Sequence, residues 1–404
     1  MSTQASRQIV LIWAIWSIVI VGYMNIAPMR YAPQRPDDSL VWTADSTNRR
    51  SLRDKPYLLE PFLNQQVAWD SEFYLSIATV GYDDPDVQLV EEGDTAYSMS
   101  YAFFPFYPYL IKVVRLPFLA IGLSPIAAST AAGLAISLLG TLAAMLALAD
   151  MIRDKSDEKH QVRTAFMMLI FPSSLFFATV YTEGLFVGLA FSSLALMRRN
   201  RLIGAAIVAA FSTWTRTIGG VLMIPLAISW FLAYRAAPPD DRTKWLLRLP
   251  VLALPLLAYA VWRLAFGTEF DFVQVNWFGN QLFQFELTID AWRQILERAQ
   301  DNPETQIVVA LNVGSVALAL FSCLYLVRQY PRLAIFGALA VIIPLTAGWT
   351  GTQSSFRYVL VVPTLWVLLG TWTQNPTFER AWMMVSILLL GMQAFLFSFD
   401  FWVA

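Results

Sequence analysis

The most unusual polar stretch of the chain is WDSEFYLSIATVGYDD, at residues 69–84. Its second residue, Asp70, stands where the pattern starts a short helix, and a carboxylate at a helix start stays ionised near neutral pH. Such a group can take a proton from a hydroxyl, so Asp70 is our candidate general base. The alternative is an N-cap role, in which Asp70 accepts bonds from the first backbone N–H groups, and the two roles are compatible.

Three further ionisable residues lie inside or at the ends of apolar runs. Glu183 is a catalytic candidate because a charge in apolar sequence is costly, and its alternative is a helix-start residue at the membrane boundary. Arg216 and Arg357 are candidate phosphate-binding residues, since a guanidinium binds phosphate through two parallel hydrogen bonds. Either arginine could instead anchor its helix at the membrane interface, and Arg216 could pair with Glu183.

A second acidic group, Asp83, Asp84 and Asp86, flanks Pro85 just after the stretch that begins at Trp69. A run of this kind next to proline is typical of a solvated turn. The alternative is a second acid, or a set of oxygen ligands for a hard divalent cation. We assign no metal and no cofactor to the protein.

Aromatic residues accompany most of these charges. The segment GTEFDFVQVNWFGNQ, residues 267–281, alternates rings with amides and carboxylates, a mixture that suits the apolar faces and hydroxyls of a sugar. Trp277 by itself also fits an aromatic belt at the membrane interface. Beside Asp70 and Glu183, the candidate substrate-binding residues are Trp69, Tyr74, Asp83, Asp84, Tyr181, Arg216, Trp277, Arg357 and Tyr358.

The composition indicates that these residues are carried by a membrane protein. Of 404 residues, 57% are hydrophobic and 14% are charged, against about 25% charged in soluble proteins. The 28 basic and 29 acidic residues give no net positive charge, which argues against a nucleic-acid-binding protein. The single cysteine, Cys323, and the single histidine, His160, exclude an intrachain disulfide and zinc sites built on paired cysteines or several histidines.

A membrane-spanning helix needs about 20 apolar residues, and the sequence predicts about eleven such spans in a single domain, residues 1–404. The first, Ile9 to Ala27, has the pattern of an uncleaved signal anchor. The others are predicted near residues 125–149, 164–180, 183–197, 202–217, 219–234, 247–265, 307–327, 333–349, 357–373 and 381–399.

The loops between these spans predict the topology. Residues 103–122 carry three prolines and two cations, so we expect a helix at the membrane surface there rather than a span. With the N-terminus cytoplasmic, the inner loops collect fifteen of the basic residues and the short outer turns only three, as the positive-inside rule requires. Residues 28–124 and 266–306 then form two outer loops on the side that holds the candidate site.

The first outer loop should contain a surface helix that starts at Asp70. Phe73, Ile77 and Val80 would form its apolar face, and Gly81 follows at its C-terminal end. We expect this helix to rest on the membrane surface. The segment 28–66, with its prolines and scattered charges, is expected to be irregular.

The order of motifs resembles a known family. WDSEFYLSIATVGYDD, AFFPFYPYLIKVV, FPSSLFFATVYTEGLF, TWTRTIGGVL and FRYVLVVP occur in the order found in the second mannosyltransferases of glycosylphosphatidylinositol assembly. These enzymes belong to the GT-C class of integral-membrane glycosyltransferases, and the likeness covers roughly residues 61–365. Two departures, Phe73 in place of histidine and Thr217-Ile218-Gly219 in place of serine-asparagine-glycine, bear on the acceptor rather than on the fold.

The resemblance implies a GT-C-like bundle in the plasma membrane and a polyprenyl-phosphate sugar donor used on the outer face. Asp70 matches the acidic residue that serves as the base in that class, while Glu183 and Arg216 match further motif positions. We expect inverting transfer of a sugar, mannose first among the candidates, to a lipid or glycan acceptor, with membrane lipids as further partners and no nucleic acid. The alternative is a secondary transporter or lipid-linked-sugar flippase; the gathering of polar residues at one face and the lack of a visible inverted repeat argue against it.

Overall fold

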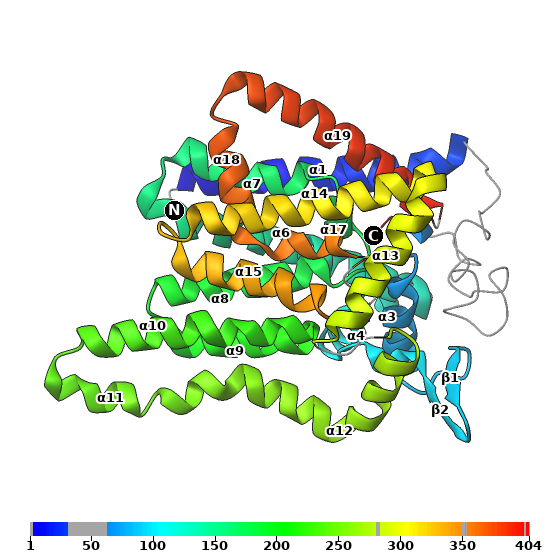
Figure 1. Ribbon diagram of the computed structural model, residues 1–404, viewed down its shortest axis with the longest axis horizontal. Coiled ribbons are helices and arrows are strands. Elements are labelled where there is room, and N and C mark those ends of the chain that lie inside the picture. Colours follow the sequence, from blue (N-terminus) through cyan, green and yellow to red (C-terminus); the bar gives the residue numbers. More distant parts are fainter. Residues whose placement is uncertain are drawn as a thin grey trace.

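The computed structural model describes residues 3–30, 63–279, 283–348, 352, 354–399 and 401–403, which form a helical bundle with one small hairpin (Figure 1). Its α-helices are α1 (Thr3–Arg30), α3 (Asp70–Thr79), α4 (Phe106–Val114), α5 (Leu116–Ala120), α6 (Pro125–Ile152), α7 (Glu158–Ile170), α8 (Glu183–Arg198), α9 (Leu202–Thr215), α10 (Met223–Ala236), α11 (Arg242–Leu246), α12 (Leu254–Asn276), α13 (Phe285–Asp301), α14 (Pro303–Leu326), α15 (Pro331–Leu345), α17 (Ser355–Tyr358), α18 (Pro363–Trp372) and α19 (Pro376–Ser398). Short 3-10 helices are η2 (Asn64–Gln66), η3 (Met99–Ala102), η4 (Arg153–Lys155), η5 (Ser174–Ala178), η6 (Thr217–Leu222), η7 (Pro239–Asp241), η8 (Leu249–Ala253) and η9 (Val359–Val361), and strands β1 (Leu89–Glu92) and β2 (Thr95–Ser98) pair antiparallel.

The predicted helical membrane architecture is confirmed, but the count of eleven spans is not. Each predicted apolar run contains helix, yet within the described ranges six helical segments are long and apolar enough to cross a membrane. A seventh candidate is the pair formed by 355–361 and 363–372, bent by 85°, while α9 and α15 are apolar but shorter. Prolines account for two of the interruptions, because a residue before proline avoids helical geometry: Phe171 and Val362 are both extended.

Helices α6 and α8 cross closely through glycines. A Cβ atom on Gly140 would lie 2.4 Å from the carbonyl oxygen of Gly184, and one on Gly184 would lie 2.1 Å from that of Ser137. Only glycine allows the two backbones to approach this closely. Since Gly184 follows the first residue of α8, this crossing determines where Glu183 lies.

The two sets of loops predicted from charge lie at opposite ends of the bundle. Figure 1 shows the N-terminus and α11 at one end and α3, α4, α13 and the β1–β2 hairpin at the other. The prediction that residues 28–66 are irregular falls mostly outside the described residues, and α1 continues to Arg30. Which end faces the cytoplasm remains a prediction.

The expectation that the helix at Asp70 rests on the membrane surface is wrong. Every residue of α3 from Ser71 to Ala78 is buried, polar as well as apolar, and only the flanking Val80 is largely exposed. The face assigned to solvent is covered because α4, η3 and α6 pack around α3. The hydroxyl of Ser76 is satisfied there by donating to the Asp84 carboxylate at 2.7 Å.

The segment 103–122 does not form a span, as predicted. It contains two short helices, α4 and α5, and α4 is tied into the bundle by Tyr107. The Tyr107 hydroxyl donates to the carbonyl of Gly133 at 3.0 Å and lies 3.1 Å from the Ser137 hydroxyl, which donates to the carbonyl of Tyr181. These bonds link the first outer loop to the backbone just before Glu183.

The second outer segment is largely helical. Helix α12 continues through residues 267–276 beyond a non-helical residue, Phe266, and α13 follows. The start of α13 is hydrogen-bonded to the turn after α15, since the backbone N–H of Gln284 donates to the Thr346 carbonyl. Both helices therefore approach the region where α3 and α17 lie.

Candidate active site

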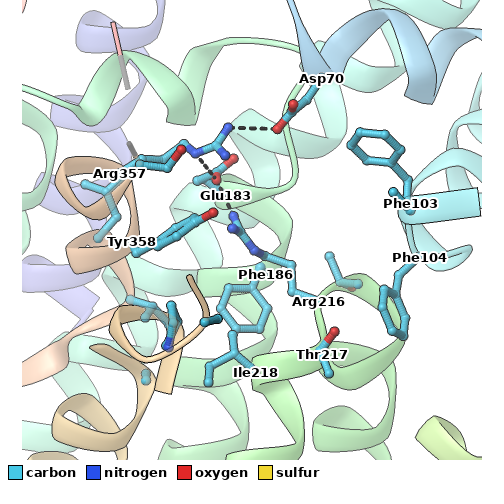
Figure 2. A pocket seen from close by; sticks show the side chains of 18 of the residues that line it. Asp70, Phe103, Phe104, Glu183, Phe186, Arg216, Thr217, Ile218, Arg357 and Tyr358 are labelled. Atoms are coloured by element: carbon cyan, nitrogen blue, oxygen red, sulfur yellow. Dashed lines mark hydrogen bonds and ion pairs between the residues drawn. The ribbon is translucent and has the colours of Figure 1, made fainter. Parts of the chain in front are cut away.

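A cavity of about 290 Å³ lies between the first outer loop, α8, η6, α12, α15 and α17. One wall is polar and carries Asp70, Glu183, Arg216 and Arg357 (Figure 2). Much of the remaining lining is aromatic or aliphatic, with Phe103, Phe104, Phe186, Ile218, Phe270, Phe278, Pro344 and Leu360 among its side chains. A charged wall together with apolar lining can hold the ionic and the hydrophobic parts of one amphipathic molecule.

The four charged side chains form a continuous series of alternating sign. Arg357 Nη1 donates to Asp70 Oδ2 at 2.9 Å, and Arg357 Nε lies 3.3 Å from Glu183 Oε1. Arg216 Nη1 also donates to Glu183 Oε1 (Figure 2). Two carboxylates and two guanidinium groups thus neutralise one another, which makes their shared burial tolerable.

All four residues stand where a helix begins or breaks. Asp70 and Glu183 are the first residues of α3 and α8, and Arg216 is the extended residue between α9 and η6. Arg357 belongs to α17, just before the bend at Pro363. At such positions a side chain can point past the end of its helix into a cavity rather than lie against the helix surface.

Asp70 is not the N-cap of its helix. The N-cap position is taken by Trp69, whose φ of 57° and ψ of −120° are unusual for a residue other than glycine, and no side-chain capping bond is made. The Asp70 carboxylate instead bonds to Arg357. The alternative role considered for Asp70 is therefore wrong, and its carboxylate belongs to the cavity.

The two arginines differ in their access to the cavity. The Arg357 side chain is 6% exposed and lies within cation–π distance of Phe176, Tyr181 and Tyr358. The Arg216 side chain is 22% exposed and lies over the Tyr358 ring at 5.0 Å. Arg216 can therefore reach a bound anion directly, whereas Arg357 is held among rings and carboxylates.

The backbone beside Arg357 is fixed from two sides. The amide N–H of Phe356 donates to Asn312 Oδ1 at 2.7 Å, and the Phe356 carbonyl accepts from the Ser173 hydroxyl at 2.8 Å. Both polar partners are buried, so these bonds are costly to break. They hold α17 against α14 and against the link between α7 and α8.

Tyr74 adds a neutral hydroxyl to the cavity wall. Burial raises the pKa of the Tyr74 phenol well above its ordinary value, and the nearby Asp70 carboxylate raises it further. The phenol is therefore a proton donor, not an anion, at neutral pH.

Comparison with known proteins now decides the family. A profile described as "Mannosyltransferase (PIG-V)" matches residues 10–266, more than half of the chain. The chain belongs to the mannosyltransferase (PIG-V) family. This confirms the resemblance that the five motifs indicated and places the chain in a family of membrane glycosyltransferases. No curated protein sequence matches the chain.

Solved structures with a related arrangement are more remote from this mannosyltransferase-family chain. An Archaeoglobus fulgidus oligosaccharyltransferase, in complex with Zn and sulfate, is 15% identical with a TM-score of 0.44, over 93% of this chain and 53% of that one. The same organism's AglB, in complex with an inhibitory peptide and a dolichol-phosphate, is 14% identical with a TM-score of 0.40, over 95% and 55%. ArnT from Cupriavidus metallidurans in the apo state is 14% identical with a TM-score of 0.43, over 83% and 72%. The chain thus spans about half the length of the two oligosaccharyltransferases, and the assignment rests on the family match.

Within this family member, the structure brings together most of the candidate residues. Asp70, Tyr74, Glu183, Arg216, Arg357 and Tyr358 line the cavity. Tyr181 lies behind it, with its ring 5.1 Å from the Arg357 guanidinium. Trp69 does not line the cavity but packs edge-on against Trp402, which does, at 4.9 Å between ring centroids.

Three candidate residues lie elsewhere, which corrects the predicted site. Asp83 accepts a bond from the Tyr101 hydroxyl at 2.8 Å, and Asp84 accepts from Ser76 and from the backbone N–H of Asp86. These bonds describe a turn that closes the loop after α3, the interpretation first considered for this acidic group. Within the described ranges, no group of three or more His, Cys, Asp or Glu side chains is arranged to hold a metal ion.

Trp277 is the third residue outside the cavity. It is 39% exposed at the end of α12, while Gln274 and Phe278 on either side of it line the cavity. The sequence predicts a loop for this segment, and a loop has no helical periodicity. In the structure, the periodicity of α12 determines which of these neighbouring side chains points into the cavity.

Other lining residues were not among the candidates. Phe103 and Phe104 lie in the AFFPFYPYL motif, which was recognised without a role for these rings. Trp402 reaches the cavity from beyond α19, and no sequence pattern near it indicates this. The packing of α19 against α1 and η2 brings that part of the chain to the first outer loop.

Proposed function

We propose that this protein transfers a mannosyl residue from a polyprenyl-phosphate donor to a hydroxyl of a lipid or glycan acceptor. The reaction takes place at the non-cytoplasmic face of the plasma membrane and inverts the anomeric configuration. The observation that carries the proposal is the meeting of Asp70, Glu183, Arg216 and Arg357 in one cavity with apolar walls.

In the proposed reaction, Asp70 removes the proton from the acceptor hydroxyl while its oxygen attacks the anomeric carbon. The bond between that carbon and the phosphate oxygen breaks, and polyprenyl phosphate leaves with the electron pair. Arg357 donates to Oδ2 of Asp70, so Oδ1 is the oxygen placed to receive the proton.

Arg216 is the phosphate-binding residue in this proposal. It is the more exposed of the two arginines, and it faces the cavity from the extended residue between α9 and η6. A guanidinium at this position can stabilise the charge that grows on the leaving phosphate. Arg357 acts as a positioning residue, because it is buried and already engaged by both carboxylates. Glu183 contacts both guanidinium groups and holds them beside each other.

The lining fits both parts of the donor. Aromatic rings such as Phe103 and Phe278 can pack against the C–H faces of a sugar. Ile218 and Pro344 belong to the apolar helical segments 217–236 and 331–345, and their side chains suit the start of a prenyl chain. A transporter is the less favoured function, because these polar residues lie at helix ends and breaks on one side of the bundle.

The test is transfer of label from radiolabelled polyprenyl-phosphate mannose to a membrane lipid extract by the purified, full-length protein in lipid vesicles. We expect a new labelled product that is absent with Asp70→Asn and present with Asp83→Asn, a matched change outside the cavity. If wild-type protein transfers nothing from mannose, glucose or arabinose donors, the proposal fails and the transporter is favoured.

A further inference from the structure

Helix α13 has three distinct flanks. Thr288, Ala291 and Ala299 are buried against the protein, and they recur on one side of the helix. Phe285, Ile289 and Leu296 form a second stripe and are 58%, 52% and 51% exposed. The remaining flank is charged, with exposed side chains at Glu286, Asp290, Arg293 and Glu297. An exposed apolar stripe between a packed flank and a charged flank is typical of a helix that lies in the plane of a membrane surface.

The position of α13 agrees with this pattern. Figure 1 shows α13 running across the direction of α14 and α15, at the end of the bundle that holds α3 and the hairpin. Helix α14 begins only two residues after α13 ends and is one of the helices able to cross a membrane. Helix α14 packs against α13, and its own side chains Ile307 and Val313 are about half exposed, as expected of a helix that contacts lipid.

The packed flank of α13 is bonded to the wall of the cavity. The Thr288 hydroxyl accepts from the backbone N–H of Gly348 at 3.0 Å, and the Gln284 N–H donates to Thr346. Gly348 has a φ of +77°, and a Cβ atom there would lie 3.0 Å from the Leu287 side chain. The same turn carries Pro344 and Ala347, which line the cavity.

We propose that α13 is a membrane-surface helix whose stripe of Phe285, Ile289 and Leu296 inserts among lipid headgroups and the adjoining acyl chains. Through Thr288 and Gln284 it holds the turn of residues 344–348 at a constant depth relative to the bilayer. The occupant of the stripe is the lipid surface, and the inference stands whether or not the protein transfers mannose.

The test uses full-length protein with Cys323→Ala, which removes the native thiol, and a nitroxide label attached through Ile289→Cys. The protein is placed in vesicles of phosphatidylcholine and phosphatidylglycerol, and collisions of the label with lipid-soluble oxygen and with a water-soluble nickel chelate are compared. We expect the ratio of oxygen to nickel collisions to be several-fold higher at Ile289→Cys than at Asp290→Cys, the matched site on the charged flank. Leu296→Cys should repeat the result for Ile289→Cys.

Two outcomes would overturn the proposal. Nickel collisions that dominate at both Ile289→Cys and Leu296→Cys would place the stripe in water. Protection from both reagents, with dipolar broadening between labels, would show that a second copy of the chain covers it. Because Cys323 is buried, the same labels can be read with the native thiol in place if Cys323→Ala does not fold.

Discussion

At the scale of residues, the four charged side chains of the cavity interact as one series of ion pairs rather than as separate groups. Glu183 lies between two guanidinium groups and Arg357 between two carboxylates, so each inner member is held by two opposite charges. The outer members, Asp70 and Arg216, are the more exposed ones, with 24% and 22% of their side chains accessible. The groups that can touch a substrate are therefore the two ends of the series.

The first prediction concerns Asp70. Asp70→Asn keeps the size of the side chain and an oxygen for Arg357, but it removes the base. We expect the transfer rate to fall by about 10²–10⁴-fold, the range for loss of general base catalysis. Turnover measured with labelled donor checks this, and near wild-type turnover in a folded Asp70→Asn protein would exclude Asp70 as the base.

The second prediction separates the two arginines. Arg357→Gln breaks the buried ion pair with Glu183 and removes the cation bonded to Asp70, and it should destabilise the protein by about 3–5 kcal/mol as well as abolish transfer. Arg216→Gln should lower kcat by about 10²–10³-fold, as for loss of one donor to a developing charge, with a smaller loss of stability because Arg216 is partly solvated. Thermal unfolding and kcat are measured for both. An equal loss of stability in the two variants would contradict the division of roles.

At the scale of elements, the positions of the charged residues in the cavity depend on how closely the helices approach one another. Glu183 begins α8, and the glycine contacts of α8 with α6 set its position along the bundle. The turn containing Arg357 depends in the same way on buried bonds from Asn312 and Ser173. The backbone, rather than side-chain flexibility, therefore places these residues.

The third prediction tests the glycine crossing. Gly184→Ala introduces a Cβ that would lie 2.1 Å from a backbone oxygen of α6, so the helices must move apart. We expect a loss of about 1–3 kcal/mol in stability and a marked loss of transfer, because Glu183 shifts with its helix. Gly314→Ala in α14, where a Cβ meets nothing within 4 Å, is the control and should leave both properties unchanged. Wild-type activity of Gly184→Ala would show that the crossing does not position Glu183.

At the scale of the whole molecule, the predicted inner and outer loops lie at opposite ends of the helical bundle. The loops that collect basic residues lie at the end marked by the N-terminus and α11, and the first outer loop lies at the other (Figure 1). The cavity is built from elements that meet near this second end. In the proposed reaction, this position would give the cavity access to a lipid-linked donor and to an acceptor.

The fourth prediction concerns this topology. In intact cells, a membrane-impermeant maleimide should label Asp94→Cys at the tip of the β1–β2 hairpin but not Asp240→Cys in the loop between α10 and α11. Both native residues are exposed, and the native Cys323 is buried. Labelling of Asp240→Cys should appear only after the membrane is opened. The reverse pattern would place the N-terminus and the basic loops outside.

Much of this architecture was accessible from the sequence because membrane insertion depends on local hydropathy and on the charge of nearby loops. The apolar runs all contain helix, and Asp70, Glu183, Arg216 and Arg357 stood out because ionisable groups are scarce in such a chain. The family could also be recognised, because its motifs keep their order along the chain.

The tertiary structure alone decided which of these residues meet. Asp70 and Arg357 are far apart along the chain, and their ion pair exists because α17 packs beside the first outer loop. Long-range packing also buries α3. It places Gln274, rather than Trp277, and Trp402 at the cavity. Local sequence patterns do not predict such contacts, because the free energy that forms them comes from surfaces buried between distant segments.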